Sequence, residues 1–295
     1  MVNRPEVLQE KGPLLLACNH PNSFLDGMIL ATLFQQPVYA LARGDAFRLR
    51  GMNRFLRKLR LLPIYRTSEG TENLGHNYTT FDACREVFKQ DGIVVIFSEG
   101  RCENEWHLRP LKKGTARLAL GSWEQGIPLK VVPVALNYSS FESFGKDVHI
   151  YFGSSLDQNA IMSQHPEGKK MLRFNHELRG QLSDMVYEID ASDKKRLREI
   201  FSIDKKWLTY LLIPAIMGWI LHAPLFYAVK LIAFRFRGSG HYDSVTTSLL
   251  LVLYPFYWIM MIIPGCIFCG WWGILLLMLP LAAKAAVYVK RVLNW

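Results

Sequence analysis

The chain has 295 residues, with 35 Lys and Arg against 25 Asp and Glu, and therefore a formal net charge of +10. A basic chain favours nucleic acid or an anionic membrane as its partner. The sequence carries no helix-turn-helix, zinc-finger or single-strand-binding signature, so no nucleic-acid partner is expected. The five cysteines are odd in number and scattered, which argues against a disulfide framework.

The distribution of apolar residues divides the chain in two. Residues 1–200 mix charge with apolar periodicity, as a soluble α/β domain does, whereas residues 201–295 are dominated by long uncharged runs. Residues 1–12 contain four charged side chains and no apolar core, so no signal peptide is expected and the first domain should stay in the cytosol.

The first predicted element is a buried strand at Leu14–Cys18, a short apolar run followed by a polar turn. Pro21 disfavours the helical conformation for the residue before it. We therefore expect His20 in an extended or turn conformation, ahead of a helix that begins near Pro21. Asp26 follows His20 after five intervening residues. On a regular helix six steps of about 100° place two side chains out of phase, so a contact between them requires a non-helical turn.

His20 and Asp26 together have a clear chemical use. The imidazole can take a proton from an alcohol while the carboxylate holds the ring in one tautomer and stabilises the imidazolium; the base alone contributes roughly 10²–10⁴-fold in rate. The alternative is that His20 is an ordinary turn histidine and that Asp26 lies at a helix start because the helix dipole favours an acid there. The pair by itself leaves both interpretations open.

A helix over residues 23–34 and a strand over residues 37–42 come next. Residues 43–60 then carry seven Arg and Lys side chains against one acid, with apolar residues at mostly three-and-four spacing. The pattern predicts a basic amphipathic helix, which suits the headgroup layer of a membrane. The alternative is a surface helix whose apolar stripe faces the core.

Four further apolar runs read as strands, and the first two end in residues of functional type. The strand at 61–66 ends in Arg66, and the strand at 93–97 is followed by Ser98-Glu99-Gly100-Arg101. Open α/β sheets hold their ligands at the carboxyl ends of their strands. The remaining elements are expected at these positions: helices at 77–90, 115–125 and 168–189, and strands at 127–136 and 147–152.

Four of these segments resemble, in the same order, the motifs of the PlsC-like glycerolipid acyltransferases. Asn19–Gly27 resembles the first motif, although five residues rather than four separate its histidine from its aspartate, a spacing that some glycerol-3-phosphate acyltransferase-like members share. Leu61–Arg66, Phe97–Arg101 and Val132–Ala135 resemble the second, third and fourth. In the third motif Ser98 replaces a proline and the arginine comes one residue early. The resemblance covers residues 12–155.

The resemblance implies a mixed, mostly parallel sheet flanked by helices, followed by a C-terminal all-α membrane region. It implies a membrane O-acyltransferase that moves a fatty acyl group to a hydroxyl of glycerol-3-phosphate or lysophosphatidic acid in phospholipid synthesis. The donor would be acyl-CoA or acyl carrier protein, and no other cofactor is expected. No metal is implied, because we find no ligand cluster of recognisable spacing.

The resemblance also suggests roles for individual residues. His20 would be the general base and Asp26 its partner, and Arg66 would bind the phosphate of the acceptor through a bidentate fork. The other expected substrate-binding residues are Glu99, Gly100, Arg101, and Lys112 or Lys113, of which we favour Lys113. Arg66 and the two lysines would otherwise be solvated side chains at a strand end and in a loop.

Two long uncharged runs dominate the last part of the chain. Residues 207–229 contain two prolines and one histidine, and residues 244–283 contain no charged residue, with Pro264-Gly265 near their middle. We predict a membrane helix at 207–232, either a single span or a re-entrant element, and a helical hairpin at about 245–284. Lys and Arg flank every junction, so these ends should be cytosolic. A bacterial inner membrane, with the catalytic domain on its cytoplasmic face, is the expected location.

Other functions stay open at this point. One is acylation of a different lysolipid or of an amino-acid lipid, and another is a non-catalytic membrane scaffold that keeps the fold. A serine hydrolase is disfavoured, because the sequence has no Gly-x-Ser-x-Gly motif that would supply the nucleophile.

Overall fold

The structure is a computed structural model, and the residues it describes fall into two compact units. The described residues are 1–65, 76–164, 166–202, 204–270 and 276–294. The first unit comprises Met1–Asn137 and Val148–Glu188, and the second comprises Tyr138–Asp147 and Ile189–Trp295. The division near residue 200 into a catalytic domain and a membrane-embedded domain stays a prediction.

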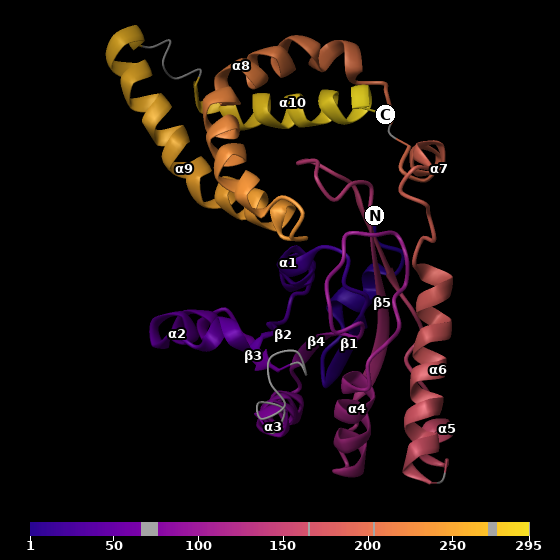
Figure 1. The fold of residues 1–295 in the computed structure, drawn as a ribbon. Coiled ribbons are helices and arrows are strands. Elements are labelled where there is room, and N and C mark those ends of the chain that lie inside the picture. Colours follow the sequence, from indigo (N-terminus) through magenta and orange to yellow (C-terminus); the bar gives the residue numbers. More distant parts are fainter. Residues whose placement is uncertain (66–75, 165, 203, 271–275, 295) are drawn as a thin grey trace. The chain divides into compact units, whose positions relative to one another are not determined.

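The first unit is built on a six-stranded sheet with the order β3-β2-β4-β1-β5-β6 (Figure 1). The strands are β1 (Leu14–Cys18), β2 (Val38–Arg43), β3 (Leu61–Ile64), β4 (Ile93–Phe97), β5 (Lys130–Tyr138) and β6 (Val148–Phe152). Strand β1 is parallel to β4 and β5, and β2 is parallel to β3 and β4. The N–H of Gly153 donates to the carbonyl of Pro133, and that of Leu156 donates to Val131. The acceptor's residue number falls along β5 as the donor's number rises, so β6 is antiparallel to β5. The expected mixed, mostly parallel sheet is confirmed.

Helices cover this sheet and close its core. They are α1 (Ser23–Leu33), α2 (Arg50–Lys58), α3 (His76–Lys89), α4 (Gly114–Glu124), α5 (Gln158–Met162) and α6 (Glu167–Met185), with 3-10 turns η1 (Pro5–Gln9) and η2 (Gly44–Phe47). Strand β1 is buried along its whole length, because its side chains are apolar on both faces. Phe88 of α3, Trp123 of α4 and Phe174 of α6 belong to one buried cluster with the strands. Apart from α2, the bounds predicted for these elements agree within four residues.

Helix α2 is shorter than predicted, and its apolar stripe does not face the core. The predicted helix over residues 43–60 is split into η2 and the shorter α2. The apolar side chains on and beside α2 are exposed rather than buried, with Leu49 at 73% and Phe55 at 56%. The alternative in which this stripe faces the core is therefore wrong.

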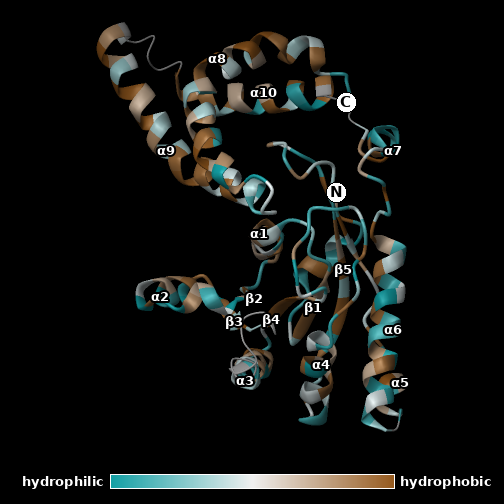
Figure 2. Ribbon diagram, viewed as in Figure 1, coloured by the Kyte–Doolittle hydropathy of each residue, from teal (hydrophilic) through white to brown (hydrophobic). Residues whose placement is uncertain are grey.

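The second unit consists mainly of helices. They are α7 (Lys194–Ile200), α8 (Leu208–Ala233), η5 (Phe234–Phe236), α9 (Tyr242–Cys269) and α10 (Leu279–Asn294). Two helical segments, Leu208–Phe236 and Tyr242–Phe268, are long and apolar enough to cross a membrane, and α9 is largely hydrophobic along its length (Figure 2).

Helices α8 and α9 form an antiparallel pair. Nε2 of His222 lies 3.1 Å from the Tyr254 hydroxyl, and Tyr257 belongs to a buried cluster with Leu225 and Val229. Helix α10 packs against α8 at Gly218, where a Cβ would lie 2.2 Å from the Ala282 carbonyl oxygen. Glycine is needed there because the two backbones approach so closely.

The prediction of a helical hairpin with its turn near Pro264-Gly265 is wrong. Helix α9 is continuous from Tyr242 to Cys269, with Pro255 and Pro264 inside it, and α8 likewise contains two prolines. Apolar helices that pack against neighbours tolerate proline, because nearby groups and local adjustments satisfy the freed carbonyls. The two long apolar helices α8 and α9 are therefore the consecutive antiparallel helices, and the turn between them lies at residues 234–241.

Candidate active site

The end of β1 is fixed on both sides before the chain reaches His20. The Asn19 side chain donates from Nδ2 to the Leu136 carbonyl of β5 at 3.1 Å, and its Oδ1 accepts from the Leu136 N–H at 2.8 Å. On the other side, the Ser98 N–H donates to the Cys18 carbonyl at 2.8 Å. These bonds extend the sheet by one residue, so that His20 begins at a rigid strand end.

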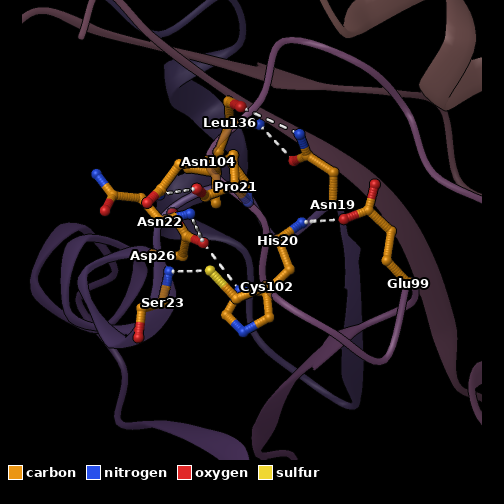
Figure 3. Close-up of polar contacts among 10 residues, drawn as sticks. All are labelled: Asn19, His20, Pro21, Asn22, Ser23, Asp26, Glu99, Cys102, Asn104 and Leu136. Atoms are coloured by element: carbon orange, nitrogen blue, oxygen red, sulfur yellow. Dashed lines mark hydrogen bonds and ion pairs between the residues drawn. The ribbon is translucent and has the colours of Figure 1, made fainter. Parts of the chain in front are cut away.

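His20 and Asp26 are in direct contact. Oδ2 of Asp26 lies 2.9 Å from Nδ1 of His20, and the same oxygen accepts the Asn22 N–H at 2.8 Å (Figure 3). Asp26 is in the first turn of α1 and is fully buried, while Pro21 and Asn22 form a bend ahead of that helix. The bend supplies the non-helical turn that the contact requires. The Asn22 bond resembles a capping box, in which a first-turn side chain accepts from the N-cap backbone.

The imidazole ring is held by a second contact. It stacks on Phe97, the last residue of β4, with centroids 3.9 Å apart and planes 13° apart. The outer ring nitrogen, Nε2, points away from Asp26 (Figure 3), and the His20 side chain is 12% exposed. When Nδ1–H donates to the carboxylate, Nε2 carries the lone pair, which is the arrangement of a general base.

Glu99 holds the backbone of the same turn. Its Oε2 accepts the His20 N–H at 2.8 Å, and its Oε1 accepts the Arg109 N–H at 2.9 Å. The residue is 4% exposed. Burial raises the pKa of the Glu99 carboxyl, while the N–H bonds from Arg109 and His20 act in the opposite direction. Both carboxylate oxygens therefore accept backbone N–H groups, and one of them holds the backbone of His20.

Gly100 and Lys113 lie on neighbouring segments at the end of β4. Gly100 has φ of +68°, and a Cβ there would lie 3.0 Å from Cγ of Lys112. The Lys112 N–H donates to the Ser98 carbonyl at 2.7 Å, which holds the loop before α4 against this strand end. Lys113 is the N-cap residue of α4, and its side chain is exposed.

Of the two predicted phosphate-binding arginines, Arg101 lies within the described residues and is turned to solvent. The Arg101 side chain is 66% exposed and forms an ion pair with Glu103. Arg66 lies outside the described residues. The residues brought into one constellation by direct contacts are thus His20, Asp26 and Glu99.

The sequence reasoning missed several residues that support the turn. The Ser23 N–H donates to Sγ of Cys102 at 2.8 Å, and Nδ2 of Asn104 donates to the Pro21 carbonyl at 2.7 Å. No local sequence pattern signals these contacts, because the donors and acceptors come from segments remote in sequence. Burial, and to a lesser degree the negative charge of Asp26, raises the pKa of the Cys102 thiol to about 12. Cys102 is therefore a structural acceptor rather than a nucleophile.

The arrangement suits proton transfer by an imidazole. Within the described part of the chain, no group of three His, Cys, Asp or Glu side chains could hold a metal ion. A hydroxyl within hydrogen-bond reach of Nε2 would give its proton to the ring while Asp26 stabilised the resulting charge.

The chain is similar to known proteins in sequence over its first part and, more distantly, in structure. Residues 1–137 match the family model described as Acyltransferase. Among solved structures, the chain is similar to the crystal structure of the 1-acyl-sn-glycerophosphate (LPA) acyltransferase PlsC from Thermotoga maritima. The identity is 14% and the TM-score 0.43, and the match covers 70% of this chain and 73% of that chain. No curated protein matches the sequence.

Proposed function

We propose, since residues 1–137 of this chain are an acyltransferase domain, that the protein acylates a glycerolipid precursor. A fatty acyl group would pass from acyl-CoA or acyl carrier protein to a hydroxyl of glycerol-3-phosphate or lysophosphatidic acid. The observation that carries the proposal is the 2.9 Å contact between Nδ1 of His20 and Asp26, which leaves Nε2 directed away from the carboxylate.

The reaction follows from this geometry. Nε2 of His20 takes the proton of the acceptor hydroxyl as its oxygen attacks the thioester carbonyl. The tetrahedral intermediate then expels the thiolate, which receives the proton from Nε2–H. Asp26 stabilises the imidazolium that exists between the two proton transfers. Glu99 acts as a positioning residue, because its carboxylate holds the backbone N–H of His20.

The phosphate of the acceptor would be bound by cations around the same strand ends. Arg66, Arg101 and Lys113 are the proposed ligands, and an arginine fork matches two phosphate oxygens. Arg101 would exchange its ion pair with Glu103 for the phosphate. Gly100, whose positive φ a glycine adopts without strain, would lie beside the phosphate with its neighbour Arg101.

The proposed reaction takes place at a membrane. The two long apolar helices support an integral membrane protein, with its catalytic domain on the cytoplasmic face of a bacterial inner membrane. The exposed apolar side chains on and beside α2, flanked by arginines, suit contact with phospholipid headgroups.

An acylation assay on membranes that contain the full-length protein tests the proposal. Acyl-CoA and acyl carrier protein donors are each offered with glycerol-3-phosphate, lysophosphatidic acid or lysophosphatidylethanolamine. We expect acylation of one of the first two acceptors and its loss in His20→Ala. Acylation of lysophosphatidylethanolamine alone would instead favour another lysolipid as the acceptor. A lipid profile in cells that is unchanged by His20→Ala would favour the non-catalytic scaffold.

A further inference from the structure

The second unit contains a pocket of about 320 Å³ at the turn between α8 and α9. Three cations line it: Lys230 near the end of α8, Arg237 in the turn and Lys290 on α10. The described lining residues include one carboxylate, Glu142, from the loop Tyr138–Asp147. The lining therefore carries a surplus of positive charge.

Two other acidic residues of this unit, Asp243 and Asp147, already have cationic partners. Asp243 forms an ion pair with Lys146, and Asp147 forms one with Arg291. Across the residues that the structure describes, Lys230, Arg237 and Lys290 form no ion pair. Glu142 therefore supplies one negative charge against three positive ones, and the pocket keeps a surplus of positive charge among the described residues.

Two of the cations lie against the same aromatic ring. Nζ of Lys230 lies 4.9 Å from the centroid of the Phe226 ring, and Nζ of Lys290 lies 5.6 Å from the same centroid. Burial lowers the pKa of Lys290, and the positive charge of Lys230 lowers it further. Like charges gathered at one ring repel each other, and an anion between them would offset that repulsion.

The surroundings of the pocket indicate what kind of anion fits. The guanidinium carbon of Arg237 lies 5.8 Å from the centroid of the Phe234 ring, so this cation too is paired with an aromatic wall. Leu231 and Ile232, on the adjacent turn of α8, are exposed apolar side chains. Cations and aromatic rings at the end of two apolar helices are typical of the membrane headgroup layer, where the acyl chains of the lipid lie beside the helices.

We propose that this pocket binds the phosphate group of an anionic glycerophospholipid. The three cations bind the phosphate, Phe226 and Phe234 face the glycerol, and the acyl chains lie along the exposed apolar surface of α8 and α9. A free phosphate would use the cations but not the apolar surface. The pocket shares no residue with the His20 constellation, so the inference goes beyond the proposed acyl transfer and is tested without it.

The test compares lipid retention by three forms of the full-length protein purified in detergent. The first is the natural sequence, and the second is K230Q/R237Q/K290Q. The third, K205Q/R235Q/K284Q, removes the same number of charges at exposed positions outside the pocket. Each is incubated with phosphatidylglycerol or with phosphatidylcholine of the same acyl chains, and the bound lipid is counted by native mass spectrometry.

We expect the natural sequence to prefer phosphatidylglycerol and the pocket variant to lose roughly 100-fold in affinity for it, since each headgroup cation contributes on the order of tenfold or less. The matched control should change little. Equal losses in the pocket variant and the control would overturn the proposal, as would equal retention of the two lipids. If the pocket variant does not fold, single K230Q and R237Q substitutions at exposed positions should each weaken phosphatidylglycerol binding by up to about tenfold.

A competition arm separates the two sources of phosphate. Inorganic phosphate is added to the protein with bound phosphatidylglycerol. We expect no displacement at millimolar concentrations, because the apolar contacts of the lipid are missing from the competitor. Displacement at those concentrations would show that the cations act as a free-phosphate site and would overturn the lipid assignment.

Discussion

One carboxylate oxygen of Asp26 bonds both to Nδ1 of His20, at 2.9 Å, and to the N–H of Asn22, at 2.8 Å. The aspartate thus orients the ring and holds the turn that brings the ring to it. Because Asp26 is fully buried, this geometry is protected from competition by water.

His20→Ala should abolish acyl transfer while leaving the protein folded. The imidazole is the only group in the proposed mechanism that moves the proton, and a general base contributes roughly 10²–10⁴-fold in rate. The measurement is the rate of acyl transfer at saturating donor. His176→Ala, an exposed histidine on α6, is the matched control and should retain the natural rate. A variant at position 20 with more than about a tenth of that rate would contradict the proposed base.

Asp26→Asn should lower kcat by roughly 10²–10⁴-fold with a small effect on KM. An amide at this position can accept one hydrogen bond with its oxygen, but its NH₂ group presented to Nδ1 would favour the wrong tautomer of His20. Steady-state kinetics with the acceptor as the varied substrate checks the split. A change confined to KM would instead place Asp26 in acceptor binding.

Glu99→Gln should destabilise the protein by about 1–3 kcal/mol, because the amide leaves one of two buried N–H groups, on His20 or on Arg109, without an acceptor. The same substitution should change the pH dependence of unfolding. The usual pKa of glutamate here is 4.5, and burial raises the folded value above it. Between those two values the folded state keeps its proton and the unfolded state loses it, so stability falls as pH rises.

The free energy of unfolding by denaturant, determined at several pH values, measures this effect. The natural protein should lose stability, relative to Glu99→Gln, as pH rises from 4.5 through the raised pKa of Glu99. Parallel pH profiles for the two proteins would show that Glu99 does not titrate differently on folding.

Cys102 should resist alkylation in the folded protein. With a pKa of about 12, its thiolate fraction at pH 8 is on the order of 10⁻⁴. Mass spectrometry after iodoacetamide treatment should find Cys102 unmodified until the protein is denatured. Cys102→Ser keeps an acceptor for the Ser23 N–H and should retain activity. Rapid modification of the native thiol would contradict the burial that the structure describes.

The apolar stripe of α2 should enter a lipid headgroup layer. An environment-sensitive fluorophore is attached at Phe55→Cys, in a background with Cys266 and Cys269 replaced by Ala. In anionic nanodiscs its emission should shift to shorter wavelengths than the emission of the same fluorophore on a peptide in water. The same probe at Tyr78→Cys, an exposed position on α3, should keep an aqueous spectrum. Matching spectra at the two positions would mean that α2 is an ordinary solvated helix.

The sequence was sufficient for the elements that depend on local pattern. Apolar runs predicted the positions of β1 and β4, and apolar periodicity predicted those of α3 and α4. These predictions succeed because burial of one or both faces determines which consecutive residues are apolar. The non-helical turn between His20 and Asp26 could also be predicted, since Pro21 restricts the conformation of the residue before it. The prediction from proline was wrong in α9, where packing in an apolar environment allowed the helix to continue through Pro264.

The tertiary structure alone decided which groups meet across the chain. Glu99 was expected to touch substrate, yet its carboxylate accepts the N–H groups of His20 and Arg109. The contact of Cys102 with Ser23 and the gathering of Lys230 and Lys290 at Phe226 were likewise absent from every local pattern. The physical reason is that periodicity reports how a residue faces its own helix or strand, whereas these contacts depend on distances between segments that are remote in sequence.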